Sequence, residues 1–593
     1  MISDLLRTKS LDEILAAPEA GHGPTLRRHL SVWALMALGI GAIIGAGIFS
    51  TVGTAAAGGA DHPGSGPAII LSFALTAIAC GFAGLCYAEL SSMVPISGSA
   101  YTYSYATLGE LVAWIIGWDL IIEYAVGNIA VAISWSGYFQ ELLRGFGLQW
   151  PPWLGIDYRT AAQSAARVAD VQAAGGDALS ELGASVVRMA GALTTAPHFG
   201  AIPLVFNLPA FLIVLLITVI LVRGIRESAG FNNWMVGLKL AIIGFFVVFG
   251  AFYVKPENWT PFAPNGFRGI ASAAAIIFFA YIGFDAVSTA AEESRDPRRD
   301  MPRAILGSLA VCTVIYIAVA AVLTGMLPWG QLGTAEPLAT AFSNLGMGWP
   351  ALVISLGAVF ATTSVLLVFQ LGQPRIFFSM ARDGLLPEWA ARIHPKYRTP
   401  HVTTWITGWF VAVLAGLANI DEIVQLTNIG TLFAFVLVCL GVTVLRYKDP
   451  GRERPFRVPG GAWLVPLLGA ACCIFLMVYL PPASWWRFIG WLVLGAAIYA
   501  AYGWRMSVLG RRAGRPVENP RFMQIVALGF LLAGVGLFTI PHDAGLGELV
   551  REASTAGVVD HGRALWGGLL IVSGLIALGA GAALGAARRD AAR

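Results

Sequence analysis

Long apolar runs recur along almost the whole of this sequence and limit the folds that it can adopt. Fourteen runs can be distinguished within the 593 residues, and most reach the roughly 20 apolar residues that a helix needs to cross a bilayer. Hydrophobic residues make up 57% of the chain and charged residues 12%, against roughly 25% charged residues in a soluble domain. We therefore predict an all-α polytopic membrane protein with about fourteen transmembrane helices, near residues 31–57, 68–92, 108–141, 204–222, 229–253, 266–290, 304–327, 350–374, 402–419, 423–445, 461–480, 485–504, 522–540 and 565–587.

The basic residues predict the orientation of these helices, because Lys and Arg are retained on the cytoplasmic side of short loops. With a cytoplasmic N-terminus, 28 of the 38 Lys and Arg lie in cytoplasmic segments, 9 lie in outer segments, and Lys239 lies within a span. We expect a multi-pass protein of the cell (inner) membrane with both termini in the cytoplasm. A long outer loop is expected near 141–203, and its Ala-rich centre, residues 160–190, can form a peripheral helix.

The first apolar run contains a cluster of glycines, Gly39-Ile-Gly-Ala-Ile-Ile-Gly-Ala-Gly-Ile-Phe49. Glycine destabilises a helix interior, so we predict that this span is broken at Gly45-Ala46-Gly47. Unwound backbone at membrane depth is tolerated only where it lines a cavity or is covered by protein, which favours a binding site at the break. Close packing of two helices at the glycines is the alternative.

The sixth run repeats this pattern, because Gly283 and Asp285 interrupt the apolar segment Ile276-Ile-Phe-Phe-Ala-Tyr-Ile-Gly-Phe-Asp285. The two interrupted spans are five spans apart. An odd number of spans places the second five-helix unit upside down relative to the first, so we expect inverted repeats formed by spans 1–5 and 6–10, followed by four C-terminal spans.

Four ionisable residues lie inside the apolar runs, namely Asp119, Glu123, Lys239 and Asp285. Charges in hydrocarbon are costly and indicate functional groups. Asp119 and Glu123 share one helix face because they are four residues apart. Glu123 is a candidate for proton handling or substrate contact. Asp119 has either a role of this kind or a structural role as a hydrogen-bond acceptor. Asp285 can stabilise the unwound backbone or take part in proton coupling.

Lys239 lies about 11 residues into the fifth run, roughly 16 Å along a helix and therefore near the bilayer midplane. A dry environment disfavours the charged form of a lysine, which allows it to gain and lose a proton. We predict that Lys239 is the proton-coupling group, with Glu123 and Asp285 as further candidates. A permanent ion pair of Lys239 with Glu123 or Asp285 is the alternative.

Several motifs resemble those of the cationic amino acid transporter family, a member of the amino acid–polyamine–organocation superfamily. They are Arg7-Thr-Lys-Ser-Leu-Asp-Glu13, the glycine cluster at 39–49, Tyr87-Ala-Glu-Leu-Ser-Ser-Met-Val-Pro-Ile-Ser-Gly-Ser-Ala-Tyr101, and Phe278-Phe-Ala-Tyr-Ile-Gly-Phe-Asp285 followed by Ala291-Glu-Glu293. The resemblance covers about residues 5–510. It implies an amino acid substrate, a lysine in span five at the place of the sodium ion of sodium-coupled relatives, and Phe279 as an aromatic gate; a packed core aromatic is the alternative for Phe279.

An α-amino acid presents a carboxylate and an ammonium, and broken helices offer the opposite partial charges. We expect the N–H groups of Gly45, Ala46 and Gly47 to bind the carboxylate. The ammonium is expected at the carbonyls of residues in both breaks, which are Ile43, Ile44, Phe279, Ala280 and Ile282. The resemblance implies the same set.

These observations favour a proton-coupled permease for cationic or neutral L-amino acids that works by alternating access. The alternatives are an amino acid or polyamine exchanger without proton coupling, and a membrane sensor of amino acids. An enzyme is disfavoured, because no Ser/His/Asp set, metal cluster or phosphate-binding loop accompanies the spans. We expect no cofactor, no metal and no nucleic acid partner, while a small accessory subunit or an oligomer remains open.

Three regions follow from this interpretation: a cytoplasmic segment 1–30, a ten-span transport core 31–446, and residues 447–593 with four further helices and a cytoplasmic tail. At the inner ends of the spans we expect ion pairs between acidic and basic residues. The acids are Glu89, Glu292 and Glu293, and the bases are Arg295, Arg298 and Arg299.

Overall fold

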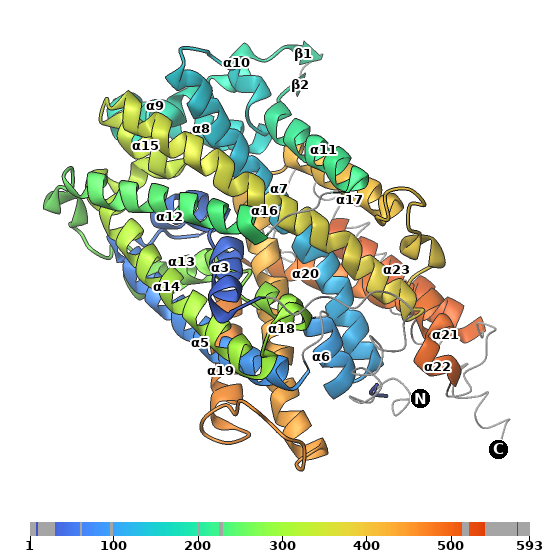
Figure 1. The fold of residues 1–593 in the computed structure, drawn as a ribbon. Coiled ribbons are helices and arrows are strands. Elements are labelled where there is room, and N and C mark those ends of the chain that lie inside the picture. Colours follow the sequence, from blue (N-terminus) through green and yellow to red (C-terminus); the bar gives the residue numbers. More distant parts are fainter. Residues whose placement is uncertain are drawn as a thin grey trace.

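The structure is a computed structural model of the chain, and it describes residues 7–9, 30–59, 62–94, 99–199, 202–224, 229–512, 521–539 and 578. Within these residues the protein is a bundle of helices with one pair of two-residue strands (Figure 1). Seven of the described helices are long and apolar enough to cross a membrane, or nine if each of two bent helix pairs counts as one span. The predicted all-α membrane fold is confirmed.

The ten predicted core spans each correspond to a described helix or broken helix. In order they are α3 (Val32–Ile43) with η1 (Gly47–Thr51) and α4 (Val52–Ala57), α5 (Ile69–Met93), α7 (Glu110–Gly145), α11 (Leu208–Arg223), α12 (Ala229–Ala251), α13 (Gly266–Ile277) with η5 (Phe278–Tyr281) and η6 (Asp285–Glu293), α14 (Pro297–Met326), α16 (Gly348–Arg382), α17 (His401–Leu417) and α18 (Ile420–Lys448). Short helices connect them: η2 (Gly66–Ala68), α6 (Ser99–Thr107), η4 (Pro256–Trp259), η7 (Trp329–Gln331), α15 (Pro337–Asn344) and η8 (Glu388–Ala391).

The C-terminal region continues with α19 (Leu464–Val478), α20 (Pro482–Ile498), η9 (Tyr499–Gly503), α21 (Trp504–Met506), α22 (Val508–Arg512) and α23 (Arg521–Thr539). The predicted eleventh and twelfth spans form a helix pair bent by 114°. The fourth, ninth and thirteenth spans correspond to shorter apolar helices at Leu208–Arg223, His401–Leu417 and Gln524–Ala533. Apart from position 578, the fourteenth predicted run, 565–587, lies outside the described residues, so the count of fourteen remains a prediction.

Helices that are five spans apart pack against each other. Extensive contacts join α7 with α16, α5 with α14, and α11 with α17, which are spans three and eight, two and seven, and four and nine. A two-fold axis between two repeats brings equivalent elements together near the axis. Helices α18 and α7, and α14 and α3, are also in extensive contact, so the inverted repeats remain a prediction.

The predicted outer loop folds into three helices, which we call the cap: α8 (Tyr158–Ala173), α9 (Ala178–Ala190) and α10 (Ala192–Thr195). The short η3 (Pro152–Leu154) precedes the cap, and the antiparallel strands β1 (His198–Phe199) and β2 (Ile202–Pro203) follow it. Asp157 begins α8 by accepting a hydrogen bond from the backbone N–H of Thr160 at 2.9 Å, and Asp177 caps α9 in the same way. The expected peripheral helix is therefore present, as two main helices at one end of the bundle (Figure 1).

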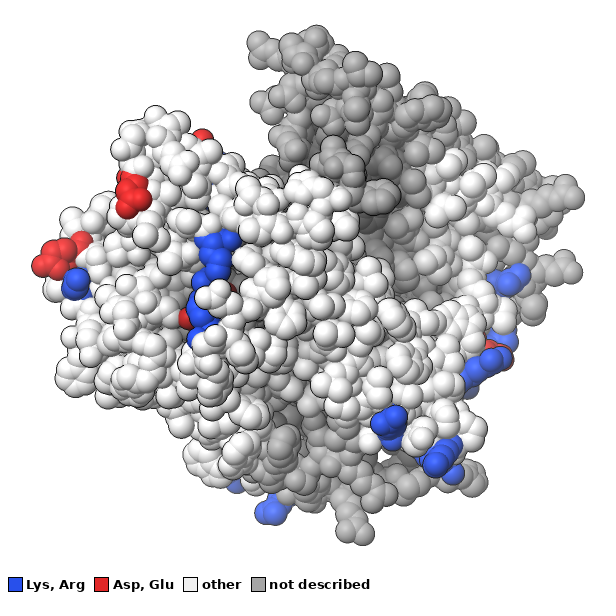
Figure 2. Space-filling view, turned by 90° about the horizontal axis from the view of Figure 1, so that it is seen from above, with Lys and Arg blue, Asp and Glu red and all other residues white. Residues whose placement is uncertain are grey.

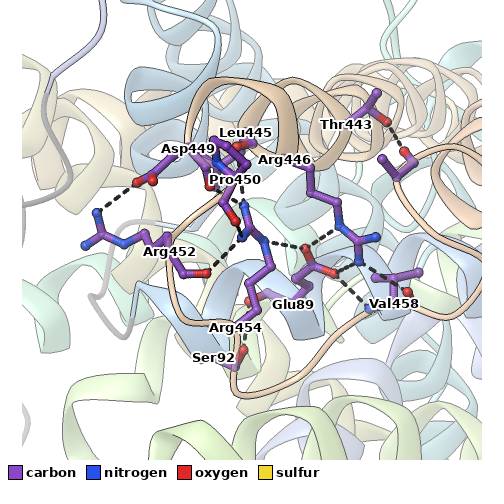
Figure 3. A network of polar contacts seen from close by, with 11 residues as sticks. Glu89, Ser92, Thr443, Leu445, Arg446, Asp449, Pro450, Arg452, Arg454 and Val458 are labelled. Carbon is purple, nitrogen blue, oxygen red and sulfur yellow. Dashed lines mark hydrogen bonds and ion pairs between the residues drawn. The ribbon is translucent and has the colours of Figure 1, made fainter.

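A buried ion cluster lies where α5 and α18 meet the segment that follows α18 (Figure 3), at the end of the bundle opposite the cap (Figure 1). The Glu89 carboxylate is 2% exposed and accepts hydrogen bonds from Arg446 Nε at 2.9 Å, from Arg446 Nη2 and from the Val458 backbone N–H at 2.8 Å. Arg454 Nε lies 3.5 Å from the same carboxylate. The expectation that Glu89 forms an ion pair is confirmed.

The basic residues predicted as partners of Glu89 were wrong. Glu89 pairs with arginines that follow span ten, because α5 packs against α18, whereas Arg298 forms an exposed ion pair with Glu453. The side chains of Glu292 and Glu293 lie outside the described residues. Of the predicted N-terminal segment, only residues 7–9 and Leu30 are described, and Lys9 Nζ lies 3.3 Å from Asp383 at the end of α16.

Candidate functional site

The first span is broken at Ile44 and Gly45, one residue before the predicted break at Gly45-Ala46-Gly47, and Ala46 already has helical backbone angles. Helix α3 ends at Ile43, Ile44 has an extended ψ of 99°, and the helical backbone resumes as a π-helix from Gly47. The two halves are bent by 42°. The first N–H groups of the second half lack a preceding helical carbonyl, and Gly45, Ala46 and Gly47, which are predicted to bind a carboxylate, lie at this start of the half-helix.

The second break lies in span six, between Tyr281 and Asp285. Ile282 has an extended ψ of 134°, and Gly283 has a φ of +115°, which L side chains rarely adopt. The Asp285 carboxylate accepts a hydrogen bond from the Gly283 N–H at 3.3 Å. One of the two roles considered for Asp285, stabilising the unwound backbone, is therefore seen in the structure.

The two breaks lie directly against each other in the buried core. A Cβ added to Gly47 would collide with the Cα and backbone nitrogen of Ala280, and one added to Gly283 would lie 2.9 Å from the backbone of Ala42. The glycines therefore serve close packing as well as the break, so the two alternatives drawn from the sequence do not exclude each other.

Tyr316 of α14 joins both breaks, and no motif in the sequence indicated this role. Its fully buried hydroxyl lies 2.9 Å from the carbonyl oxygen of Ile43 and 2.9 Å from that of Ala280. Both carbonyls were expected to bind an ammonium group. Since a carbonyl oxygen has two lone pairs, each can still accept a second hydrogen bond.

Lys239 reaches the first break from α12. Its side chain is 2% exposed, and Nζ donates hydrogen bonds to the carbonyls of Gly41 at 2.8 Å and Ile44 at 3.1 Å. Among the described residues, which include Glu123 and Asp285, no carboxylate forms an ion pair with Lys239. The structure thus gives no support to the permanent ion pair considered as the alternative.

The buried acids gather separately, between α7, α18 and the second break. Glu123 interacts electrostatically with Asp285 and Asp119, and with the Thr431 hydroxyl. Asp119 is fully buried beside Gly430, and neither of its carboxylate oxygens has a hydrogen-bond partner within the described part of the chain. The structure therefore brings Glu123, Asp119 and Asp285 together and holds Lys239 through other groups.

Two further residues complete the surroundings of the second break. Phe279 is 5% exposed, which fits both an aromatic gate and a packed core residue. Asn428 of α18 donates hydrogen bonds of 2.8 Å to the carbonyls of Ala275 and Ile276, at the end of α13 where the helix gives way to η5. This contact could not be predicted, because an asparagine within an apolar run does not reveal its partner.

Two helix breaks that pack against each other inside an all-helical membrane bundle are typical of secondary transporters. The chain belongs to the amino acid permease family, since the family described as "Amino acid permease" matches residues 30–498. This range contains both breaks, Lys239 and Tyr316. The chain is therefore a member of a transporter family and not of an enzyme family.

Three relatives indicate the range of the family. The chain is 44% identical over 510 residues to the methylthioribose transporter of Bacillus subtilis (strain 168), across 86% of this chain and 100% of the relative. It is 44% identical over 512 residues to the branched-chain amino acid permease BcaP of the same organism, with the same coverage. Cationic amino acid transporter 4 of Homo sapiens is 34% identical over 456 residues, covering 75% of this chain and 63% of the relative.

The resemblance stated from the sequence is therefore correct for the superfamily and too narrow for the family. The cationic amino acid transporters match, but at lower identity than the two Bacillus subtilis proteins. The roles assigned to individual site residues remain predictions.

Proposed function

We propose that the protein is a secondary active amino acid permease that couples uptake to protons and works by alternating access around the two breaks. Family membership supports the amino acid substrate. The names of the relatives include a branched-chain amino acid permease and cationic amino acid transporters. We therefore extend the proposal to neutral and cationic L-amino acids, with methylthioribose as a further compound to test.

The binding mode follows from the polarity of the half-helices. The substrate carboxylate binds the N–H groups of Gly45, Ala46 and Gly47, because a helix N-terminus attracts anions. The ammonium binds carbonyls of Ile43, Ile44, Phe279, Ala280 and Ile282, and Phe279 closes over the side chain as a gate. Tyr316 fixes two of these carbonyls and so sets the distance between the breaks.

The observation that carries the proton coupling is the position of the Lys239 ammonium on the carbonyls of Gly41 and Ile44. A protonated Lys239 donates both hydrogen bonds and holds α12 against the first break. A neutral amine donates fewer hydrogen bonds and attracts the carbonyls less, so loss of the proton loosens this contact. Asp285 bonds to the second break and Glu123 interacts electrostatically with Asp285, and we propose both acids as further groups on the proton path.

The proposal includes a location and an orientation. The protein resides in the cell membrane, as the name of a bacterial permease relative suggests, with both termini in the cytoplasm and the cap outside. The rival functions are an amino acid or polyamine exchanger without proton coupling and a membrane sensor that binds amino acids without transport.

Uptake by purified protein in proteoliposomes tests these alternatives, with labelled L-leucine, L-arginine, spermidine and methylthioribose as substrates. A permease accumulates at least one of them when a proton gradient is imposed. Lys239→Met should abolish this accumulation and retain part of the exchange activity, whereas Lys255→Met, which changes an exposed lysine, should behave as wild type.

Wild-type accumulation in Lys239→Met would refute the assignment of Lys239. Exchange without any response to the gradient in the wild type would favour the exchanger, and saturable binding without flux would favour the sensor.

A further inference from the structure

A cavity of about 860 Å³ lies between the cap and the end of the transport core. This volume falls within the roughly 300–1,000 Å³ of small-molecule sites. Its walls come from the core, including Thr54, Gly137 and Glu336, and from α8, including Gln163, Arg167 and Asp170. Viewed from the cap end, basic and acidic side chains lie together within a mostly uncharged face (Figure 2).

The cavity adjoins the first broken span, because Thr54 of α4 and Ala335, whose carbonyl accepts a hydrogen bond from Ser50, line it. Ser50 and Phe49, which directly follow the break, bond to the residues beneath the cavity: the Ser50 hydroxyl lies 2.6 Å from the Ser134 hydroxyl and also bonds to the Ala335 carbonyl. The Tyr138 hydroxyl bonds to the carbonyl of Phe49. Along this span, Phe49 and Ser50 lie between the break and Thr54, which lines the cavity, so we place the cavity on the cap side of these contacts.

Arg167 differs from the other arginines near the cavity. Arg144 pairs with Glu141, Arg159 pairs with Glu422, and Arg188 interacts electrostatically with Glu336. Arg167 is half-buried, and its Nη2 donates to the carbonyl of Gly330 at 3.2 Å. Among the described residues no carboxylate pairs with it. A half-buried guanidinium without an anion favours the binding of a carboxylate from solution.

Asp170 lies one helical turn beyond Arg167 on α8 and lines the same cavity. Residues three apart on a helix are neighbours, yet the described structure contains no ion pair between these two side chains. The half-buried guanidinium of Arg167 and the exposed carboxylate of Asp170 therefore line one cavity without forming an ion pair, an arrangement complementary to the carboxylate and ammonium of an α-amino acid.

We propose that this cavity is a second amino acid site, in which Arg167 binds the carboxylate and Asp170 the ammonium of a substrate waiting above the closed contacts of Ser50 and Tyr138. This second site rests on the proposed function. It delivers substrate to the site between the two breaks, and only for substrate that enters from the cap side. Its loss raises the apparent KM for substrate entering from that side, whereas the KM from the opposite side is unaffected.

The test is sided transport in proteoliposomes of known orientation, with labelled L-leucine and L-arginine as probes. Arg167→Gln and Asp170→Asn should each raise KM from the cap side about tenfold, the effect of losing about 1.4 kcal/mol of binding free energy, with KM from the other side within twofold of wild type. Arg159→Gln removes an equal charge from α8 outside the cavity lining and should leave both KM values unchanged.

Equal KM changes on both sides, or none in either variant, would overturn the second site while leaving the permease intact. Absence of transport of every substrate in the wild type would instead refute the proposed function. Binding stoichiometry gives an independent measure: two molecules per chain in the wild type and one in Arg167→Gln support the site, and one in both contradicts it.

Discussion

At the scale of single residues, Gly47 and Gly45 flank the first break but have different surroundings. A side chain at Gly47 would meet the backbone of Ala280, which cannot move away without separating the two breaks. At Gly45 it would lie 3.1 Å from Val365 Cγ2, the end of a side chain that can shift. We expect Gly47→Ala to lower substrate affinity at least tenfold and Gly45→Ala to lower it less.

Equilibrium binding of labelled substrate to purified protein measures this difference. Gly81→Ala is the matched control, because a Cβ at Gly81 has no atom within 4 Å among those of the described structure. Equal affinity of Gly47→Ala and Gly81→Ala would show that the break is not the substrate site.

Some site residues can be recognised from the sequence and others cannot. A cluster of glycines or a lysine is unusual in an apolar run, so the first break and Lys239 stood out. Tyr316 and Asn428 did not, because their importance depends on which buried carbonyls lack a helical donor, and only the packing of distant segments decides that. The partners of Glu89 were missed for the same reason, since Arg446 is 357 residues away.

At the scale of elements, Tyr316 connects α14 to both broken spans with a single hydroxyl. Tyr316→Phe keeps the ring and its contacts with Phe73 and Tyr281 and leaves two buried carbonyls without this donor. An unsatisfied buried polar group costs about 1–3 kcal/mol. We therefore expect a lower melting temperature of the purified protein than that of the wild type.

Tyr253→Phe is a suitable comparison, because Tyr253 is 37% exposed and its hydroxyl can remain hydrated. Both variants lose one oxygen atom, so a decrease limited to Tyr316→Phe reports the connection between the breaks. Equal melting temperatures in the two variants would argue against this role.

The elements themselves were largely predictable, because span length and apolar composition follow directly from the thickness of the bilayer. The details of the breaks were not. Sequence suggested unwound backbone at residues 45–47, whereas the structure has a π-helix over Gly47–Thr51 and a 3₁₀-helix over Asp285–Glu293. These forms depend on neighbours such as Ala280 and Ala42, which the local sequence does not specify.

At the scale of the whole molecule, the Glu89 cluster joins α5, α18 and the segment after α18 (Figure 3). Glu89→Gln leaves Arg446 and Arg454, whose side chains are 14% and 6% exposed, without their carboxylate. Breaking a buried pair from one side costs about 3–5 kcal/mol. We expect a marked loss of thermal stability in detergent, measured by the melting temperature.

Glu453→Gln offers the contrasting case, because the Glu453–Arg298 pair is 77% and 63% exposed. An exposed pair contributes about 0–1 kcal/mol, so this variant should melt close to the wild type. A Glu89→Gln protein as stable as Glu453→Gln would mean that the cluster does not hold this end of the bundle together.

At this scale the orientation in the membrane decides whether substrate enters the cell from the cap side. The predicted orientation depends on the excess of basic residues at the end opposite the cap. Five of the six cysteines are buried and Cys472 is half-buried, so a cysteine introduced at an exposed position can be distinguished by labelling. In intact cells, an impermeant maleimide should react with Gln172→Cys on α8 and not with Arg298→Cys. Permeabilised cells should label both variants, which controls for the reactivity of the two cysteines.

Lys and Arg are retained on the cytoplasmic side, where the membrane surface is negative, so position 298 is expected inside the cell. Reaction of Arg298→Cys in intact cells would reverse the predicted orientation. The cavity above Ser50 would then face the cytoplasm.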